Sequence, residues 1–161
     1  AISDLTVCIL DRPRHKDIIG EARKAGARIL LIPDGDIAGV IAATGPDATV
    51  DLCIGTGGAP EGVLAAAALR CVGGQMQGRL LFRDADERDR AHRIGITDLD
   101  RKYSMEEMAA GDVIFTATGV TTGGMLRGVR RENGVIVTDS IVMRAKSGTI
   151  RRIEGRRRVA S

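Results

Sequence analysis

The chain has 161 residues, of which 43% are hydrophobic, and its formal net charge is +3. This size and composition suit one folded domain with an ordinary core and exclude a disordered chain. No run approaches the roughly 18 apolar residues of a membrane-spanning helix, and no secretory signal pattern is found, so we expect a cytoplasmic protein without a membrane partner.

The first half of the sequence alternates strand patterns with helix patterns. Short apolar runs rich in β-branched residues predict strands, and the amphipathic or alanine-rich stretches after them predict helices. Strands are expected at residues 5–10, 28–32, 50–54 and 77–82, and helices at residues 15–25, 37–43, 60–71 and 84–93. This alternation predicts an α/β fold with a mostly parallel sheet covered by helices.

The second half predicts a different arrangement. A short helix at residues 105–109 leads into a strand at 112–117 and a loop rich in threonine and glycine at 118–124. Two runs at 135–143 and 149–153 predict a C-terminal antiparallel strand pair. We interpret residues 1–161 as a single α/β domain, and we expect it to be a piece of a longer protein because it starts at Ala1 without a methionine.

Arginines are concentrated at the end of the chain, at residues 151–152 and 156–158. A basic tail is compatible with nucleic-acid binding. This one has no interleaved aromatic residues to stack on bases, and solvated arginine-rich strands are common. We therefore expect no nucleic-acid partner.

Ligands of a parallel α/β sheet bind at the carboxyl ends of the strands, where the loops gather. The first such loop contains Arg12, Pro13 and Arg14. Proline restricts its own backbone and that of the residue before it, so both guanidinium groups can emerge on one side and make two-point contacts with a phosphate. A solvated helix start with surface ion pairs is the alternative, and His15 is expected to cap or pack rather than to act as a base.

The second loop contains Asp34, Gly35 and Asp36 at the start of a predicted helix. One aspartate can cap this helix, which leaves the other for sugar hydroxyls or a divalent cation.

The third loop is the turn Gly55-Thr56-Gly57-Gly58, followed by Pro60 and Glu61. Backbone N–H groups at a helix start attract phosphate, but Glu61 would repel it unless a cation lay between them. A role of Glu61 as a simple first-turn helix acid is the alternative. Arginines for phosphate, carboxylates for hydroxyls and Glu61 for Mg²⁺ or Mn²⁺ together suggest a sugar-phosphate enzyme that works by metal-assisted hydrolysis.

Taken in order, the three loops resemble the class II fructose-1,6-bisphosphatases, a family that includes bifunctional fructose/sedoheptulose bisphosphatases. The matching motifs are LDRPRH at residues 10–15, IPDGD at 32–36 and GGAPEGVLAAAA at 57–68. The resemblance implies a phosphatase dependent on Mg²⁺ or Mn²⁺ that converts fructose 1,6-bisphosphate to fructose 6-phosphate and phosphate, in gluconeogenesis or the Calvin cycle. Sedoheptulose 1,7-bisphosphate is a further candidate substrate, and a homo-oligomer is expected.

The resemblance also implies roles for individual residues. The substrate-binding positions are Arg12, Pro13, Arg14, Asp34, Gly35, Asp36 and Gly58, and the metal ligand is Glu61. The implied fold is the C-terminal domain of the sugar-phosphatase architecture related to inositol monophosphatases.

One departure from the family is large. The family carries most of its metal carboxylates, and an Asp-Pro-x-Glu-Gly-Thr type segment that positions the attacking water, in an N-terminal half that this sequence lacks. The chain therefore resembles the C-terminal half, with no catalytic residue of its own and the missing half as its partner. Because a hard cation needs several oxygen ligands, we expect the chain alone to hydrolyse sugar phosphates poorly or not at all.

A non-catalytic phosphate- or nucleotide-binding α/β module is the alternative function. Its support is the glycine turn between a strand and a helix, although Gly55-x-Gly57-Gly58 lacks the full GxGxxG spacing of dinucleotide-binding turns.

Overall fold

The computed structural model describes residues 1–44 and 48–159, without the side chains of Asp36 and Ala42. Its first part is a three-stranded parallel sheet of order β2-β1-β3, made of β1 (Thr6–Leu10), β2 (Arg28–Ile32) and β3 (Leu52–Cys53). The strands lie where the sequence predicts them. β3 is shorter than its predicted range, and before it the Asp51 carboxylate accepts a hydrogen bond of 2.7 Å from the N–H of Thr6.

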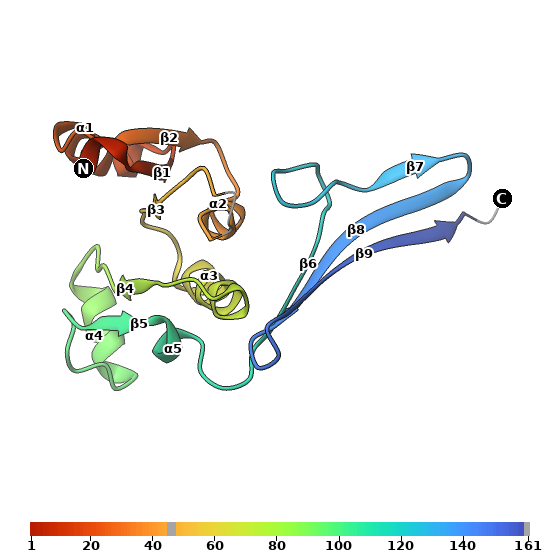
Figure 1. The fold of residues 1–161 in the computed structure, drawn as a ribbon. Coiled ribbons are helices and arrows are strands. Elements are labelled where there is room, and N and C mark those ends of the chain that lie inside the picture. Colours follow the sequence, from red (N-terminus) through yellow and green to blue (C-terminus); the bar gives the residue numbers. More distant parts are fainter. Residues whose placement is uncertain (45–47, 160–161) are drawn as a thin grey trace.

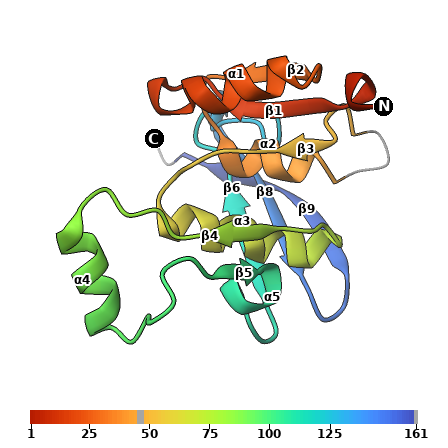
Figure 2. The same ribbon diagram turned by 90° about the vertical axis from the view of Figure 1, so that its left-hand side faces the viewer.

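Helices cover both faces of the parallel sheet (Figures 1 and 2). The short helices η1 (Ile2–Asp4) and η2 (Pro13–His15) flank β1, and α1 (Lys16–Lys24) follows η2. Ile19 of α1 packs on Val7 and Ile9 of β1. Because side chains alternate along a strand, Cys8 faces the other way, where Gly39 of α2 (Asp36–Ala42) approaches the sheet.

The long helix α3 (Ala59–Val72) joins this parallel unit to the rest of the molecule (Figure 1). Three of its buried residues are alanines, Ala65, Ala66 and Ala68, whose small side chains let neighbouring elements pack close to the helix. Gly73 ends it in the left-handed conformation, at φ 78°, which favours glycine. Ala68 and Cys71 form one core with Phe115, Ile141 and Met143 of the C-terminal strands.

The expected fourth parallel strand is wrong. β4 (Gln77–Arg79) pairs in antiparallel fashion with β5 (Lys102–Ser104) in a separate two-stranded sheet. The connecting helix α4 (Ala85–Arg93) buries only Ala91, so it has no apolar face with which to cover a parallel crossover. It lies apart from the other elements in Figure 2.

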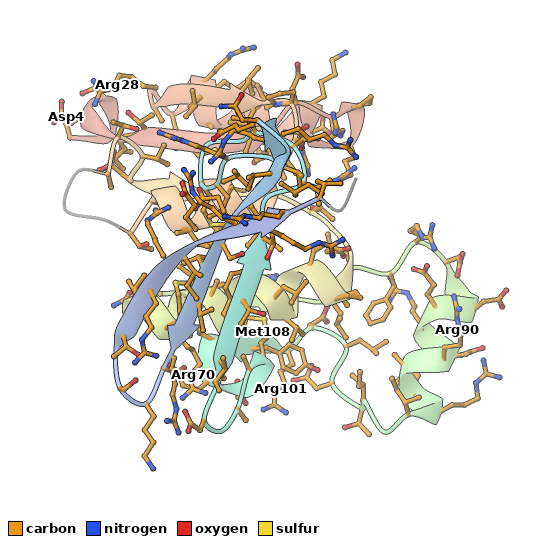
Figure 3. The ribbon with its side chains drawn as sticks, turned by 90° about the vertical axis from the view of Figure 1, so that its right-hand side faces the viewer. Asp4, Arg28, Arg70, Arg90, Arg101 and Met108 are labelled. Carbon is orange, nitrogen blue, oxygen red and sulfur yellow. The ribbon has the colours of Figure 1, made fainter. Side chains whose placement is uncertain are left out.

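Hydrogen bonds from α3 hold the segment that follows β5. The short helix α5 (Met105–Met108) follows β5 directly, and the Arg70 guanidinium at the end of α3 donates to the carbonyl oxygens of Ala109 and Gly111. Figure 3 shows Arg70 and Met108 in this part of the molecule.

The C-terminal strands form one antiparallel sheet of order β6-β8-β7, with β9 on the other edge of β8. They are β6 (Ile114–Thr118), β7 (Arg130–Glu132), β8 (Val135–Arg144) and β9 (Thr149–Arg158). The predicted strand pair is therefore confirmed as the β8–β9 hairpin, but within a larger sheet. The fold is mixed α/β, and the expectation of a mostly parallel sheet is too broad, since three strands of the described residues pair in parallel and the other six pair in antiparallel fashion. Among the described residues, no helix is long and apolar enough to cross a membrane.

Candidate functional site

The three loops predicted to bind ligand follow the carboxyl ends of the three parallel strands. Because β1, β2 and β3 run in the same direction, these ends lie along one edge of the sheet. The loop after β1 leads into η2, the loop after β2 into α2, and the loop after β3 into α3. The fold therefore places all three loops at one edge.

The buried side chain of His15 connects the first loop to the third. It is fully buried, with 0% of its surface exposed. Its Nδ1 lies 2.9 Å from the carbonyl oxygen of Leu10, which can only accept, so Nδ1 carries the hydrogen. The N–H of Thr56 donates to Nε2 at 2.8 Å. Nε2 also lies 3.0 Å from the carbonyl oxygen of Thr56. His15 therefore packs and positions a loop, as expected, and its contacts with Leu10 and Thr56 fix the glycine turn against the end of β1.

The arginines on either side of Pro13 make different contacts. Arg14 Nε donates to the carbonyl oxygen of Thr56 at 2.7 Å, so this side chain turns toward the glycine turn. Arg12 donates to the carbonyl oxygen of Asp11 and lines a pocket beside α1. Both arginines are exposed, and neither has a carboxylate partner among the described residues.

The capping role expected for one aspartate of the second loop is wrong. Gly35 occupies the N-cap of α2 at φ 76°, a left-handed conformation that other residues rarely adopt. Asp34 precedes the cap and is exposed, and Asp36 is the first residue of the helix. Neither aspartate therefore occupies the N-cap position of α2. The side chain of Asp36 lies outside the described part of the structure.

Gly58 and Glu61 lie together at the start of α3. Gly58 is the N-cap, Ala59 and Pro60 follow, and Glu61 occupies the first turn. The Glu61 carboxylate folds back over Gly58, so that a Cβ at position 58 would lie 2.2 Å from Oε2. The carboxylate thus occupies the space that a side chain at position 58 would fill, at the helix start beside the glycine turn.

The donor set at Glu61 fits a hard cation only in part. A carboxylate is a suitable ligand for Mg²⁺ or Mn²⁺, but the described residues contain no group of three or more His, Cys, Asp or Glu side chains that could hold a metal ion. Glu61 can supply one ligand of a shared site, and the others would have to come from outside these residues.

Sequence reasoning missed the contact between His15 and Thr56, two residues 41 positions apart. A histidine directly after the Arg-Pro-Arg turn was the available signal, but a sequence does not show its distant partner.

Backbone N–H groups in and beside the threonine- and glycine-rich loop at residues 118–124 donate to acceptors within the protein. Gly123 N–H donates to the carbonyl oxygen of Leu126, and Gly128 N–H to the Thr122 hydroxyl. Gly119 N–H donates to the carbonyl oxygen of Asp139. These bonds indicate that the loop is a structural turn.

The fold and the site place the chain among α/β proteins that gather ligand-binding loops at the carboxyl edge of a parallel sheet. The profile of the family described as "Bacterial fructose-1,6-bisphosphatase, glpX-encoded" matches residues 1–157, and the chain belongs to this family.

Curated relatives agree with this assignment. The "Fructose-1,6-bisphosphatase class 2" of Haemophilus influenzae is 42% identical over 168 residues, which cover 96% of this chain and 50% of the relative. The "Fructose-1,6-bisphosphatase 1 class 2" of Escherichia coli K12 is 43% identical over 166 residues, which cover 95% of this chain and 49% of the relative. The chain spans about half the length of the curated relatives it matches.

Proposed function

We propose that this chain forms the substrate-binding half of a metal-dependent fructose-1,6-bisphosphate 1-phosphatase, whose products are fructose 6-phosphate and phosphate. The observation that carries the proposal is the Glu61 carboxylate folded over Gly58 beside a glycine turn that His15 and Arg14 fix to the first loop. This arrangement brings a candidate metal ligand to the same sheet edge as the arginines for phosphate.

The phosphate side of the proposal rests on Arg12 and Arg14. Guanidinium groups bind phosphate oxygens through two parallel hydrogen bonds, and both side chains are exposed at the edge. Asp34 is exposed at the neighbouring loop, where a carboxylate can accept hydrogen bonds from sugar hydroxyls. Gly35 and Asp36 are the other proposed substrate-binding residues of this loop. The backbone of Gly58 is the remaining proposed contact to the substrate.

The metal side of the proposal needs a second polypeptide segment. When bound, Mg²⁺ or Mn²⁺ would supply Lewis-acid activation at Glu61. Apolar side chains on both sides of the glycine turn in the sequence are unusually exposed: Leu52 at 45%, Ile54 at 39%, Val63 at 45% and Leu64 at 47%. Exposed apolar groups of this kind mark surfaces that contact another chain or segment, which supports docking of the other half here.

Complementation tests the proposal. The chain would be mixed with a polypeptide corresponding to the uncovered half of the H. influenzae relative, and phosphate release from fructose 1,6-bisphosphate would be followed with Mn²⁺. We expect activity from the mixture and little from the chain alone. Glu61→Gln should lower kcat at least about 100-fold, as loss of a transition-state contact does.

The matched control is Glu106→Gln, which neutralises an exposed carboxylate in the first turn of another helix, α5. This variant should retain full activity. A folded mixture without activity, or undiminished activity of Glu61→Gln, would count against the proposal.

Finer properties that the family suggests belong to the same proposal. They are a cytoplasmic location, a homo-oligomeric state, the use of sedoheptulose 1,7-bisphosphate and the inositol monophosphatase-like architecture of the complete protein.

Calorimetry with NAD or ATP in the absence of metal tests the alternative of a nucleotide-binding module. This alternative requires that the chain binds these nucleotides and does not bind sugar phosphates.

A further inference from the structure

A basic pocket lies on the α1 side of the first loop, next to the proposed substrate site, with which it shares Arg12 and Pro13. Its volume is about 500 Å³, which is within the range of small-molecule sites. We call it the α1 pocket and define it by its rim of Arg12, Lys16 and Arg23 and its floor of Gly20 and Leu31.

The α1 pocket follows from the spacing of residues along α1. Lys16, Gly20 and Arg23 are four and seven positions apart, so they share one face of the helix. Gly20 has no side chain, and a Cβ there would meet nothing within 4 Å. Leu31 of β2 also lines the floor and is 37% exposed, although it points toward the α1 face of the sheet. The result is a depression between two long cationic side chains.

The positive charges of the α1 pocket are only partly balanced by the described residues that line it. Neither Lys16 nor Arg23 makes an ion pair or a side-chain hydrogen bond within the described residues, and Arg12 bonds only to a backbone carbonyl. Asp11 also lines the pocket, which leaves three positive side chains against one negative. Like charges that converge without a counter-ion repel one another, and a bound anion would relieve this repulsion.

Arginines elsewhere in the fold behave differently. Arg83 pairs with Glu87, Arg101 with Glu107 and Arg144 with Asp112. On β9, Arg152, Arg156 and Arg158 share one face of the sheet, where Arg156 pairs with Glu154 and Arg152 donates to the carbonyl oxygen of Met125. The α1 pocket is thus a place where unneutralised cations gather around a hollow.

We propose that the α1 pocket binds a phosphate group, with Lys16 and Arg23 as ligands and Arg12 shared with the substrate site. Guanidinium and ammonium groups together suit a phosphate dianion, and the open floor at Gly20 lets both helix side chains reach it. The phosphate comes either from free inorganic phosphate or from a phosphorylated sugar. Because binding here needs no metal and no hydrolysis, it can be present even if the proposed phosphatase activity is not.

Titration without divalent metal tests the proposal. Inorganic phosphate and fructose 6-phosphate would be added separately to the chain, with affinity measured by calorimetry and the site mapped by backbone amide shifts in NMR. We expect the shifts to fall in residues 12–23. Lys16→Gln and Arg23→Gln should each weaken binding about tenfold, as loss of a charged hydrogen bond does.

Lys24→Gln is the matched control, since it removes a positive charge from the same last turn of α1 at a position that does not line the pocket. It should change affinity less than about twofold. Equal affinity for the two ligands would mean that the pocket recognises the phosphate alone, and tighter binding of fructose 6-phosphate would mean that it also contacts the sugar. The proposal is overturned if neither ligand binds, if the wild-type shifts map to residues 54–58 instead, or if both pocket variants bind as tightly as Lys24→Gln.

Discussion

The parallel unit and the C-terminal antiparallel sheet use the same residue types for different purposes. In the parallel unit, Arg12 and Arg14 both follow β1, and neither has a carboxylate partner among the described residues. In the antiparallel sheet, Arg130 and Arg156 both pair with Glu154. The two arginines of the parallel unit are available to a ligand, whereas Arg130 and Arg156 of the antiparallel sheet are engaged in ion pairs within it. Composition alone, with its arginine-rich end, points to a different region from the one that we propose to bind anions.

Glycines show the same contrast. Gly58 leaves room for the carboxylate of Glu61, which is a mobile group on a flexible side chain. Gly119 leaves room for the carbonyl group of Arg127, which belongs to the backbone of a neighbouring segment. A glycine beside a flexible side chain can serve a site at little cost in stability, while a glycine beside backbone is required for the fold.

The largest effect is expected from the residue that connects the loops of the parallel unit. His15→Ala should lower the free energy of unfolding by about 3 kcal/mol, because it leaves a cavity and an unsatisfied backbone N–H at Thr56, and removes one of the donors to the carbonyl oxygen of Leu10. Urea unfolding monitored by circular dichroism measures this loss, and hydrogen exchange of the Thr56 amide should become faster.

Two conservative variants separate the contacts of His15. His15→Asn can still reach Leu10, and His15→Gln can still accept from Thr56, because their amides replace Nδ1 and Nε2 respectively. Only His15→Gln should restore protection of the Thr56 amide. Wild-type stability of His15→Ala would show that the loops of the parallel unit are held in another way.

Much of the fold, but less of the site, could be predicted from the sequence. β1, β2, α1 and α3 lie close to their predicted ranges because periodicity and glycine stops are local signals. The direction of β4 could not be predicted, since it depends on where the polar helix α4 leads the chain. The N-cap at Gly35 could not be predicted either, because two flanking aspartates are the more usual caps.

The next largest effect concerns the loop of the antiparallel sheet. Gly119→Ala would place a Cβ 2.1 Å from the carbonyl oxygen of Arg127, so the two backbone segments must move apart at a cost of about 2 kcal/mol. Gly123→Ala in the same loop is the control, since its Cβ would meet nothing within 4 Å. Both are measured by urea unfolding, and equal stability of the two variants would contradict the structural role assigned to Gly119.

Gly58→Ala should cost about 1 kcal/mol or less, since alanine tolerates the extended backbone at this N-cap. Its effect should fall on the site, because the Glu61 carboxylate must leave its place over residue 58. In the complementation assay this variant should raise the Mn²⁺ concentration needed for half-maximal activity while unfolding near the wild-type urea concentration. A large loss of stability would place Gly58 with Gly119 among the glycines that the fold requires, and the contrast would fail.

The smallest effect is expected from an ion pair at the edge of the antiparallel sheet. The hydrogen bond from the Arg144 guanidinium, at 3.1 Å from Nε to Oδ2, lowers the pKa of the Asp112 carboxyl below its usual range. Because the pKa is lower in the folded state, the pair stabilises the fold fully above the unfolded value of about 3.9, and this contribution is lost as the pH falls through the folded pKa. Asp112→Asn should therefore be slightly less stable than wild type at pH 7, and the difference should vanish in acid.

The control for this pair is Asp89→Asn on α4, where the carboxylate is exposed and makes no ion pair among the described residues. Urea midpoints of the three proteins across the acidic range measure the effect, and added salt should reduce it because both partners are partly exposed. A difference between wild type and Asp112→Asn that grows as the pH falls would contradict the expected sign. If the sign holds, the paired charge of Asp112 contributes to the stability of the antiparallel sheet. The unpaired charges of the α1 pocket, by contrast, are expected to contribute to binding and not to stability.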